Sequence, residues 1–321
     1  ARNLSYLKQN IRKQIKKPMT KQAAYNFNPE ILREYDIRGE IGHTLSEDDA
    51  YALGCAFGSY VVRKNGSKIA VGYDGRHTSP GLCKALINGL TSTGINVEDI
   101  GVGPTPMLYY AVKDRMMDAG IMITGSHNPP SYNGFKLTLN SRPVFGEDIQ
   151  EIGRLAAAGD FEQGQGEERS IDIKDSYVDR LLKDLECNGG ACDTMKIAWD
   201  CGNGATGEIV ERLTAKLPGT HVLLYSDIDG NFPNHHPDPS VDKNMDDLIK
   251  TIKDEGCHFG VAFDGDGDRI GVVDENGTII RSDILLSLYA KDVLEDNEGA
   301  PIIADVKCSQ VLFNEIKRLG G

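Results

Sequence analysis

The segment Ala119-Gly120-Ile121-Met122-Ile123-Thr124-Gly125-Ser126-His127-Asn128-Pro129-Pro130 carries more structural information than any other stretch of this sequence. Its first five residues are apolar, which predicts a short buried strand that leads into a loop. Proline fixes its own φ and keeps the preceding residue out of helical geometry, so the loop is pre-shaped. The loop presents Ser126 beside His127, and Lys136 follows shortly after it. This arrangement suits nucleophilic or phosphate-carrying chemistry, whereas an ordinary surface turn is the simpler alternative.

On both sides of this segment, apolar runs of strand length alternate with segments of helical periodicity. Ser79-Pro80 has the chemistry of a helix start, and apolar residues at helical spacing follow it. Such alternation predicts an α/β fold, with successive α/β domains whose mixed, largely parallel sheets are covered by helices. The expected strands span residues 68–73, 96–100, 119–123, 195–200, 258–263 and 270–273.

Three of the expected strands end in a glycine-rich turn that contains an aspartate, namely Asp74, Asp200 and Asp264. This internal echo is compatible with related α/β domains. The polar segment from Gly159 to Ser170 is the clearest candidate for a domain boundary. We therefore expect a basic extension at 1–28, domains at 29–170 and 171–279, and the start of an incomplete third domain at 280–321.

Composition and charge exclude several classes of function. A hydrophobic content of 40% and a charged content of 26% are typical of a globular protein. No apolar run approaches the ~18–20 residues that a membrane span requires. The net charge of −13 argues against a general nucleic-acid binder.

Cys187 and Cys192 are a candidate metal or redox pair, but the seven cysteines lack a paired CxxC framework. Reduced thiols in a cytoplasmic protein are therefore the prediction.

The N-terminal segment differs from the rest of the chain in charge. Its first 29 residues contain seven lysines and arginines and no acidic residue. Leu4, Leu7, Ile11 and Ile15 recur at helical spacing, so the segment has the pattern of a basic amphipathic helix. We interpret it as a packed or frayed extension. A targeting peptide, an interfacial helix and a docking arm are the alternatives.

The segment Asp264-Gly265-Asp266-Gly267-Asp268-Arg269 is the second place where chemistry is expected. In an extended turn, carboxylates at positions i, i+2 and i+4 can converge, and the glycines let the backbone wrap closely. Three oxygen ligands suit Mg²⁺, and three adjacent aspartates repel one another unless a cation offsets their charge. A helix–loop–helix calcium site is rejected, because Arg269 stands where that loop needs glycine and both flanks are predicted strands.

A serine loop followed by a tri-aspartate loop resembles the α-D-phosphohexomutase family, most closely its bacterial phosphomannomutase/phosphoglucomutase branch. The combination of the two loops, in this order and at this separation, is highly specific. The matching segments are Tyr35-Asp36-Ile37-Arg38-Gly39, Thr124 to Pro130, Tyr132 to Lys136 and Asp264 to Arg269, with weaker matches at 74–76, 103–106 and 231–239.

The resemblance implies a role for each matching residue. Ser126 is implied to be a phosphoserine that donates its phosphoryl group to a hexose monophosphate. The Mg²⁺ ligands are implied to be Asp264, Asp266 and Asp268, together with an oxygen of the serine phosphate. The resemblance places His127, Arg269, Lys136 and Arg38 around the transferring phosphate. It implies proton handling or charge neutralisation for Lys136 and Arg38. Substrate binding is assigned to Tyr35 and Asn128.

The implied reaction moves a phosphoryl group reversibly between the 1- and 6-positions of a hexose phosphate. It passes through a hexose 1,6-bisphosphate, which is both intermediate and activator. The partner is then a small sugar phosphate, and the expected location is the cytoplasm. The form of the loop at Tyr132 to Lys136 favours mannose or glucose over glucosamine as the sugar.

The family pattern calls for four domains, whereas this sequence stops soon after the segment that matches the start of the third. We therefore expect a C-terminally truncated chain that keeps the serine and metal sites but turns over hexose phosphates poorly or not at all. Two other hypotheses stay open. One is an aspartate-based phosphatase or phosphotransferase, and the other is a non-catalytic metal-binding fragment.

Overall fold

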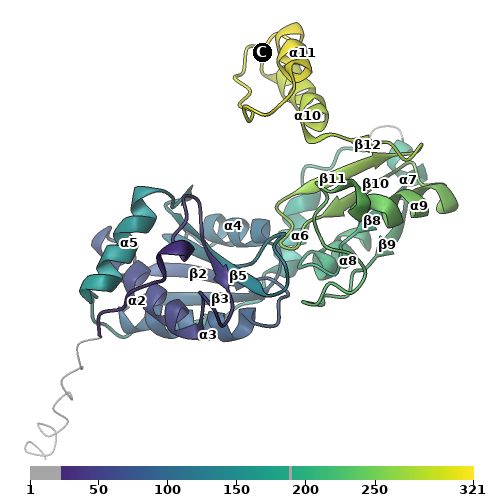
Figure 1. Cartoon of the computed structure of the whole chain (residues 1–321). Helices are drawn as coiled ribbons and strands as arrows, with labels where there is room; N and C mark the ends of the chain where they lie inside the picture. The colour runs from purple at the N-terminus through teal and green to yellow at the C-terminus, as the bar shows by residue number, and fades with distance from the viewer. Residues whose placement is uncertain (1–22, 188–189) are drawn as a thin grey trace, which may run out of the picture.

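The structure is a computed structural model that describes residues 23–187 and 190–321 of the chain. The expected basic helix falls mainly on residues 1–22, which lie outside the described residues. Residues 23–28 contain no helix or strand and lead into the short 3₁₀ helix η1 (Pro29–Ile31). The described chain forms two sheets and a separate pair of helices (Figure 1).

The first sheet is parallel at its centre and antiparallel towards one edge. Strands β4, β2, β3 and β7 run parallel, whereas β5 pairs antiparallel with both β4 and β1. Within the described residues the strand order is β1-β5-β4-β2-β3-β7, and β6 pairs with β5. The bounds are β1 (Ile37–Glu40), β2 (Lys68–Tyr73), β3 (Asn96–Val102), β4 (Ala119–Ile123), β5 (Tyr132–Leu139), β6 (Arg142–Pro143) and β7 (Glu168–Ser170).

Helices cover both faces of this sheet. On one face, α2 (Glu47–Arg63), α3 (Ser79–Ser92) and α5 (Glu147–Ala158) share a core with the buried residues of β2 and β4. Helix α2 begins with a reciprocal capping box between Ser46 and Asp49, which satisfies amides that the first turn leaves free. On the other face, α4 (Thr105–Asp114) and α6 (Lys174–Leu182) form a second core cluster.

The polar stretch 159–170, which was expected to mark the domain boundary, packs against the first sheet. The amides of Gly164 and Gly166 donate to carbonyl oxygens at the end of α3, and β7 extends the sheet beside β3. A Cβ at Gly166 would collide with the backbone of Ile95, so glycine allows this close approach. The stretch therefore belongs to the first sheet, and the chain leaves that sheet only after β7.

The second sheet has the order β12-β11-β10-β8-β9 among the described residues. Strands β10, β8 and β9 are parallel, with β9 at one edge, and β11 and β12 add antiparallel strands towards the other edge. Helix α9 packs on β8 and β10, while Ile209 of α8 joins the core cluster of α4 and α6. The bounds are α7 (Ala191–Thr194), β8 (Lys196–Asp200), α8 (Gly207–Thr214), β9 (Thr220–Leu224), η3 (Asp242–Met245), α9 (Asp246–Glu255), β10 (Phe259–Phe263), β11 (Ile270–Asp274) and β12 (Ile279–Ile280).

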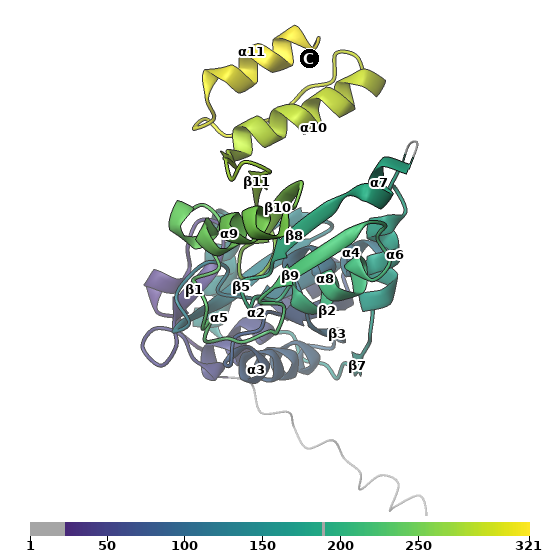
Figure 2. The same cartoon turned by 90° about the vertical axis from the view of Figure 1, so that its right-hand side faces the viewer.

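The last part of the chain stands apart from both sheets, as Figures 1 and 2 show. Helices α10 (Ser282–Asp296) and α11 (Gln310–Arg318) pack on each other through a small core of Ala290, Leu294, Leu312 and Ile316. Many apolar side chains of this part are exposed, with Ile303 at 91% and Val306 at 93%.

The expected elements are largely confirmed, including a helix that starts at Ser79 and strands at 68–73 and 119–123. The three aspartates at strand ends are all buried, and each accepts a hydrogen bond from a backbone amide of its own turn. None of the described helices is both long and apolar enough to cross a membrane.

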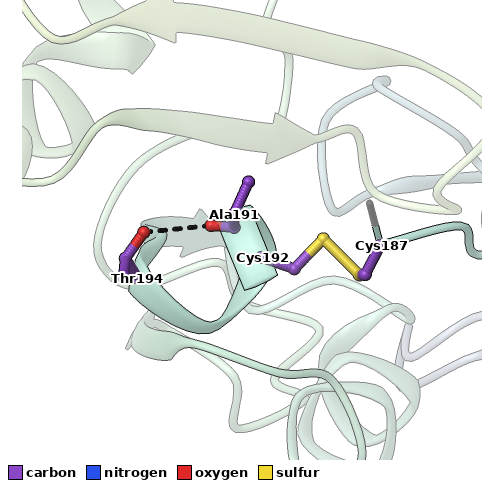
Figure 3. Close-up of a disulfide and its surroundings, with 4 residues drawn as sticks. All are labelled: Cys187, Ala191, Cys192 and Thr194. Atoms are coloured by element: carbon purple, nitrogen blue, oxygen red, sulfur yellow. Dashed lines mark hydrogen bonds between the residues drawn. A yellow bond between two sulfur atoms is a disulfide. The ribbon is translucent and has the colours of Figure 1, made fainter. Parts of the chain in front are cut away.

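The expectation that all cysteines are reduced thiols is wrong for one pair. Cys187 and Cys192 form a disulfide across the short connection between α6 and β8 (Figure 3). Their Cα atoms are 5.7 Å apart, which lies within the usual range for a disulfide. The sequence shows two cysteines five residues apart, and their spacing alone does not show that they are bonded. The other five cysteines form no disulfide among the described residues, and four of them are buried.

Candidate active site

The serine loop begins where the buried strand β4 ends. Thr124 Oγ1 accepts a hydrogen bond from the Ser126 amide at 2.7 Å, and the Asn128 amide and side-chain nitrogen both donate to the carbonyl oxygen of Gly125. Ser126 is 2% exposed and has a φ of +49°, a left-handed conformation that is uncommon for a residue with a side chain. Contacts within the loop thus help to fix its shape.

The three aspartates lie in the turn between β10 and β11, so the rejection of a helix–loop–helix calcium site is confirmed. Asp264 Oδ1 accepts hydrogen bonds from the amides of Asp268 and Arg269, which folds the turn around this carboxylate. Gly267 has a φ of +68°, which glycine adopts without strain. One carboxylate oxygen from each of Asp264, Asp266 and Asp268 lies within 4.8 Å of the others.

The two loops meet although they belong to different sheets. Ser126 Oγ donates to Asp264 Oδ2 at 3.0 Å across a separation of 138 residues. A Cβ added at Gly265 would lie 2.5 Å from the carbonyl oxygen of Ser126, so only glycine permits this approach. The candidate nucleophile and the acidic cluster therefore form one site.

Lys136 reaches the acidic cluster from β5. Its Nζ lies 2.6 Å from Asp266 Oδ2 and 2.6 Å from Asp268 Oδ2. Burial of the ammonium group lowers the pKa of Lys136, but the charges of Asp266 and Asp268 outweigh burial and raise this pKa above its ordinary value. Lys136 is therefore protonated at neutral pH in this arrangement.

The acidic cluster fits a divalent cation. Burial, followed by the charges of Asp266 and Asp268, raises the pKa of Asp264 to about 7. Asp266 Oδ1 is buried and has no hydrogen-bond partner. The raised pKa of Asp264 and the unpaired oxygen of Asp266 indicate that the negative charge of this cluster of carboxylates is not fully compensated. Clustered carboxylate oxygens are ligands that Mg²⁺ prefers.

His127 contacts the serine, and Arg38 lies near enough for its charge to affect the pKa of His127. His127 Nδ1 is 3.3 Å from Ser126 Oγ. Burial, followed by the positive charges of Arg269 and Arg38, lowers the pKa of His127, so its ring is neutral at pH 7. Arg38 is 8% exposed and pairs with Asp36 at 2.5 Å, while its Nε is buried without a hydrogen-bond partner.

The other candidate residues are placed differently. Arg269 is exposed and acts on the site through its charge and its backbone amide. Tyr35 is 79% exposed, in the loop before β1. The side-chain nitrogen of Asn128 bonds to Gly125 within the loop.

Thr105 and His236 contact the site but are absent from the predicted set. The Thr105 hydroxyl donates to Asp266 Oδ2, and the Thr105 amide donates to the Asp266 carbonyl oxygen at 2.7 Å. His236 Nε2 donates to the carbonyl oxygen of His127 at 2.5 Å. Both lie in segments with a weak family match, 103–106 and 231–239, which is the only sequence signal that pointed to them.

Comparison with known proteins agrees with this geometry. The family model for phosphoglucomutase/phosphomannomutase alpha/beta/alpha domain I matches residues 29–163, and that for domain II matches residues 175–277. A phosphomannomutase/phosphoglucomutase of Pseudomonas aeruginosa is 45% identical over 291 residues, which cover 91% of this chain and 62% of that protein. A phosphoglucomutase of Neisseria meningitidis is 42% identical over 92% of this chain and 64% of its own length.

Solved structures give the same result. A phosphoglucomutase/phosphomannomutase family protein from Burkholderia thailandensis superposes with a TM-score of 0.88 at 42% identity, covering 92% of this chain and 65% of that chain. A putative phosphomannomutase from Thermus thermophilus shares the fold, with a TM-score of 0.82 at 23% identity, covering 93% of this chain and 68% of that one. The chain spans less than two thirds of the length of the curated relatives named above. It belongs to the phosphoglucomutase/phosphomannomutase family of α-D-phosphohexomutases.

Proposed function

We propose that this chain carries the phosphoserine and the metal-binding loop of a hexose phosphate mutase. The reaction moves a phosphoryl group between the 1- and 6-positions of mannose or glucose phosphate. The observation that supports this most directly is the 3.0 Å contact between Ser126 Oγ and Asp264, with Lys136 on the other two carboxylates. The relatives span a greater length than this chain, so the complete cycle is a proposal for the whole protein.

In the first half-reaction, the bond between phosphorus and Ser126 Oγ breaks, and a bond to the free hydroxyl oxygen of the sugar phosphate forms. The sugar hydroxyl loses a proton and Ser126 Oγ gains one, and the neutral ring of His127 next to Ser126 Oγ is suited to pass that proton between them. The product is a hexose 1,6-bisphosphate. After it reorients, its other phosphoryl group returns to Ser126 Oγ, and the proton returns to the sugar oxygen.

Positive charge is the main requirement of such a transfer, because negative charge spreads over the phosphoryl oxygens. Lys136 is protonated, and Arg38 has a buried Nε that lacks a partner, so charge neutralisation is the role that the geometry supports for both. Asp264, Asp266 and Asp268 would hold Mg²⁺, which when bound supplies further positive charge next to the phosphate. Tyr35 and Asn128 are proposed to contact the sugar.

The test is to incubate the chain with Mg²⁺ and a hexose 1,6-bisphosphate and to measure its intact mass. We expect a gain of about 80 Da for one phosphoryl group. The gain is lost in Ser126→Ala and kept in Ser131→Ala, a matched control that removes an exposed hydroxyl from the same loop. Labelling of Ser126→Ala at the rate of the unmodified chain would assign the phosphate to an aspartate and refute the proposal.

Two further expectations stay proposals. We propose that residues 29–170, 171–279 and 280–321 are separate domains, which two separate sheets and a detached helix pair support. Limited proteolysis is then expected to cut first near residues 171–173 or 280–282.

We also propose a cytoplasmic location, because hexose phosphates are intracellular metabolites. Fractionation of the source cells tests it.

A further inference from the structure

The turn after β2, Asp74-Gly75-Arg76, holds a buried guanidinium group directly beneath the serine loop. Arg76 is 2% exposed. An arginine has five N–H donors, and here every one has an acceptor. Nε donates to Asp74 Oδ2, Nη1 donates to the carbonyl oxygens of Pro129 and Tyr132, and Nη2 donates to those of Ser126 and Asn128.

Four of these five bonds therefore end on the backbone of one short loop. Their lengths are between 2.6 and 3.0 Å. One acceptor is the carbonyl group of Ser126 itself, whose left-handed φ needs support from its surroundings. A Cβ at Gly125 would collide with the guanidinium group, so Arg76 and the loop backbone fit without spare room.

Asp74 completes this arrangement from below. One carboxylate oxygen accepts from Arg76 Nε and from the amide of Gly125, and the other accepts from the Ser79 hydroxyl and the Arg76 amide. The buried charge of Arg76 is thus compensated by a buried carboxylate that is itself fully hydrogen-bonded. A buried pair of this kind specifies one geometry, because any displacement leaves charged groups unsatisfied.

A loop of the part of the chain that forms the second sheet, residues 228–232, packs over the same guanidinium group. The ring of Phe232 lies 5.3 Å from Arg76 Cζ, which is within the range of a cation–π contact. A Cβ at Gly230 would lie 2.8 Å from the His77 amide nitrogen, and one at Gly75 would collide with Ile228. The turn that holds the serine loop is therefore also a docking point for residues 228–232.

We infer that Arg76 is a positioning residue for phosphoryl transfer at Ser126, and that it links the docking of residues 228–232 to the orientation of that serine. Arg76 touches no reacting atom. It fixes the carbonyl group of Ser126 and those of Asn128, Pro129 and Tyr132, which follow it in the loop. The ring of Phe232 covers the guanidinium group from the other side. This inference rests on the proposed phosphoserine at Ser126.

The test compares Arg76→Lys with Arg115→Lys. Lysine keeps the charge opposite Asp74 but cannot donate to four carbonyl groups in one plane. Arg115 is the matched control, because it is a half-buried arginine of the first sheet unit that pairs with Glu98 away from the loop. The first readout is the rate at which Ser126 takes a phosphoryl group from hexose 1,6-bisphosphate. The second is hydrogen exchange of backbone amides in residues 124–134.

For Arg76→Lys we expect phosphorylation of Ser126 about 100-fold slower and exchange in 124–134 about tenfold faster, with exchange in the second sheet unchanged. Arg115→Lys changes neither readout. If Arg76→Lys is phosphorylated at the rate of the unmodified chain, the inference is overturned. Faster exchange spread evenly over both sheets also overturns it, because a merely structural role of Arg76 would loosen the whole protein rather than the serine loop.

Two further arms keep the test decisive. If Arg76→Lys does not fold, Phe232→Leu removes only the ring that covers the guanidinium group and leaves its five hydrogen bonds in place. It is expected to speed exchange in 124–134 by a smaller factor, and no change there refutes the link between the two units. If the unmodified chain takes no phosphate at Ser126, the proposed function fails, while the exchange measurement still decides whether Arg76 orders the loop.

Discussion

Replacing Lys136 by methionine removes a positive charge that contacts both Asp266 and Asp268. The Lys136 side chain is 17% exposed, Asp266 is 0% and Asp268 is 30% exposed. Removing one partner of a buried ion pair costs about 3–5 kcal/mol, because the other charge stays buried and unpaired. The pair with Asp268 is more exposed and adds under ~1 kcal/mol. Since Thr105 still donates to the same oxygen of Asp266, we expect the lower end, about 3 kcal/mol.

Thermal unfolding at pH 8 without divalent cations measures this loss. A loss of about 3 kcal/mol lowers the midpoint by roughly 6–12 °C for a cooperative unit of about 150–250 residues. The loss is smaller near pH 5, because an unpaired Asp266 has a raised pKa and its protonated form carries no buried charge. Mg²⁺ is expected to raise the midpoint of Lys136→Met more than that of the unmodified chain, since no ammonium group then competes for the carboxylates.

Lys216→Met is the control for loss of a lysine. Lys216 pairs with Asp179 at 2.6 Å as well, but the two side chains are 43% and 67% exposed, so the expected loss is under ~1 kcal/mol. The reasoning is refuted if Lys136→Met melts within about 1 °C of the unmodified chain at pH 8, or if both lysine variants lose equal stability.

Three further outcomes are expected. Because the pKa of Asp264 is raised to about 7, Mg²⁺ must displace a proton from it when it binds. The Mg²⁺ affinity measured by calorimetry is therefore expected to be about tenfold weaker at pH 6 than at pH 8. Equal affinities at the two pH values would contradict the raised pKa. Thr105→Val removes the hydroxyl donor of buried Asp266 and lowers the free energy of unfolding in urea by about 1–3 kcal/mol. Gly89→Ala places a Cβ against the carbonyl oxygen of Tyr51, so helices α2 and α3 must move apart. This movement lowers the free energy of unfolding by about 1–3 kcal/mol. An unchanged urea midpoint would argue against this close packing.

The strands that deliver both loops could be predicted from sequence, because each is a short apolar run followed within two residues by glycine. The order of chemistry along the chain, a serine loop and then an acidic turn, was equally plain. These are local patterns, and β4 and β10 lie within one residue of the expected positions. The helix at Ser79 is predictable for the same reason, since proline at a first helical position is a local signal.

The contacts between the loops could not be predicted in the same way. The pairing of Ser126 with Asp264 depends on how two sheets dock, and no local pattern records that. The role of Arg76 is hidden for a related reason, because arginine is rarely fully buried and an Asp-Gly-Arg turn has the composition of a surface turn. Gly159 to Ser170 has the composition of a linker, while its place beside β3 depends on backbone contacts that composition does not encode.

The division of the site between two sheets also affects the order in which it is made during translation. The first sheet is complete at β7, whereas Asp264 follows Ser126 by 138 residues. At about 5–20 residues per second, a ribosome takes roughly 7–28 seconds to cover that distance. Domains generally fold as units in the order of synthesis, so the serine loop is formed while its carboxylate partners do not yet exist. The nascent chain therefore holds an ordered serine without an acidic site, and reactivity begins only when the second unit folds and docks.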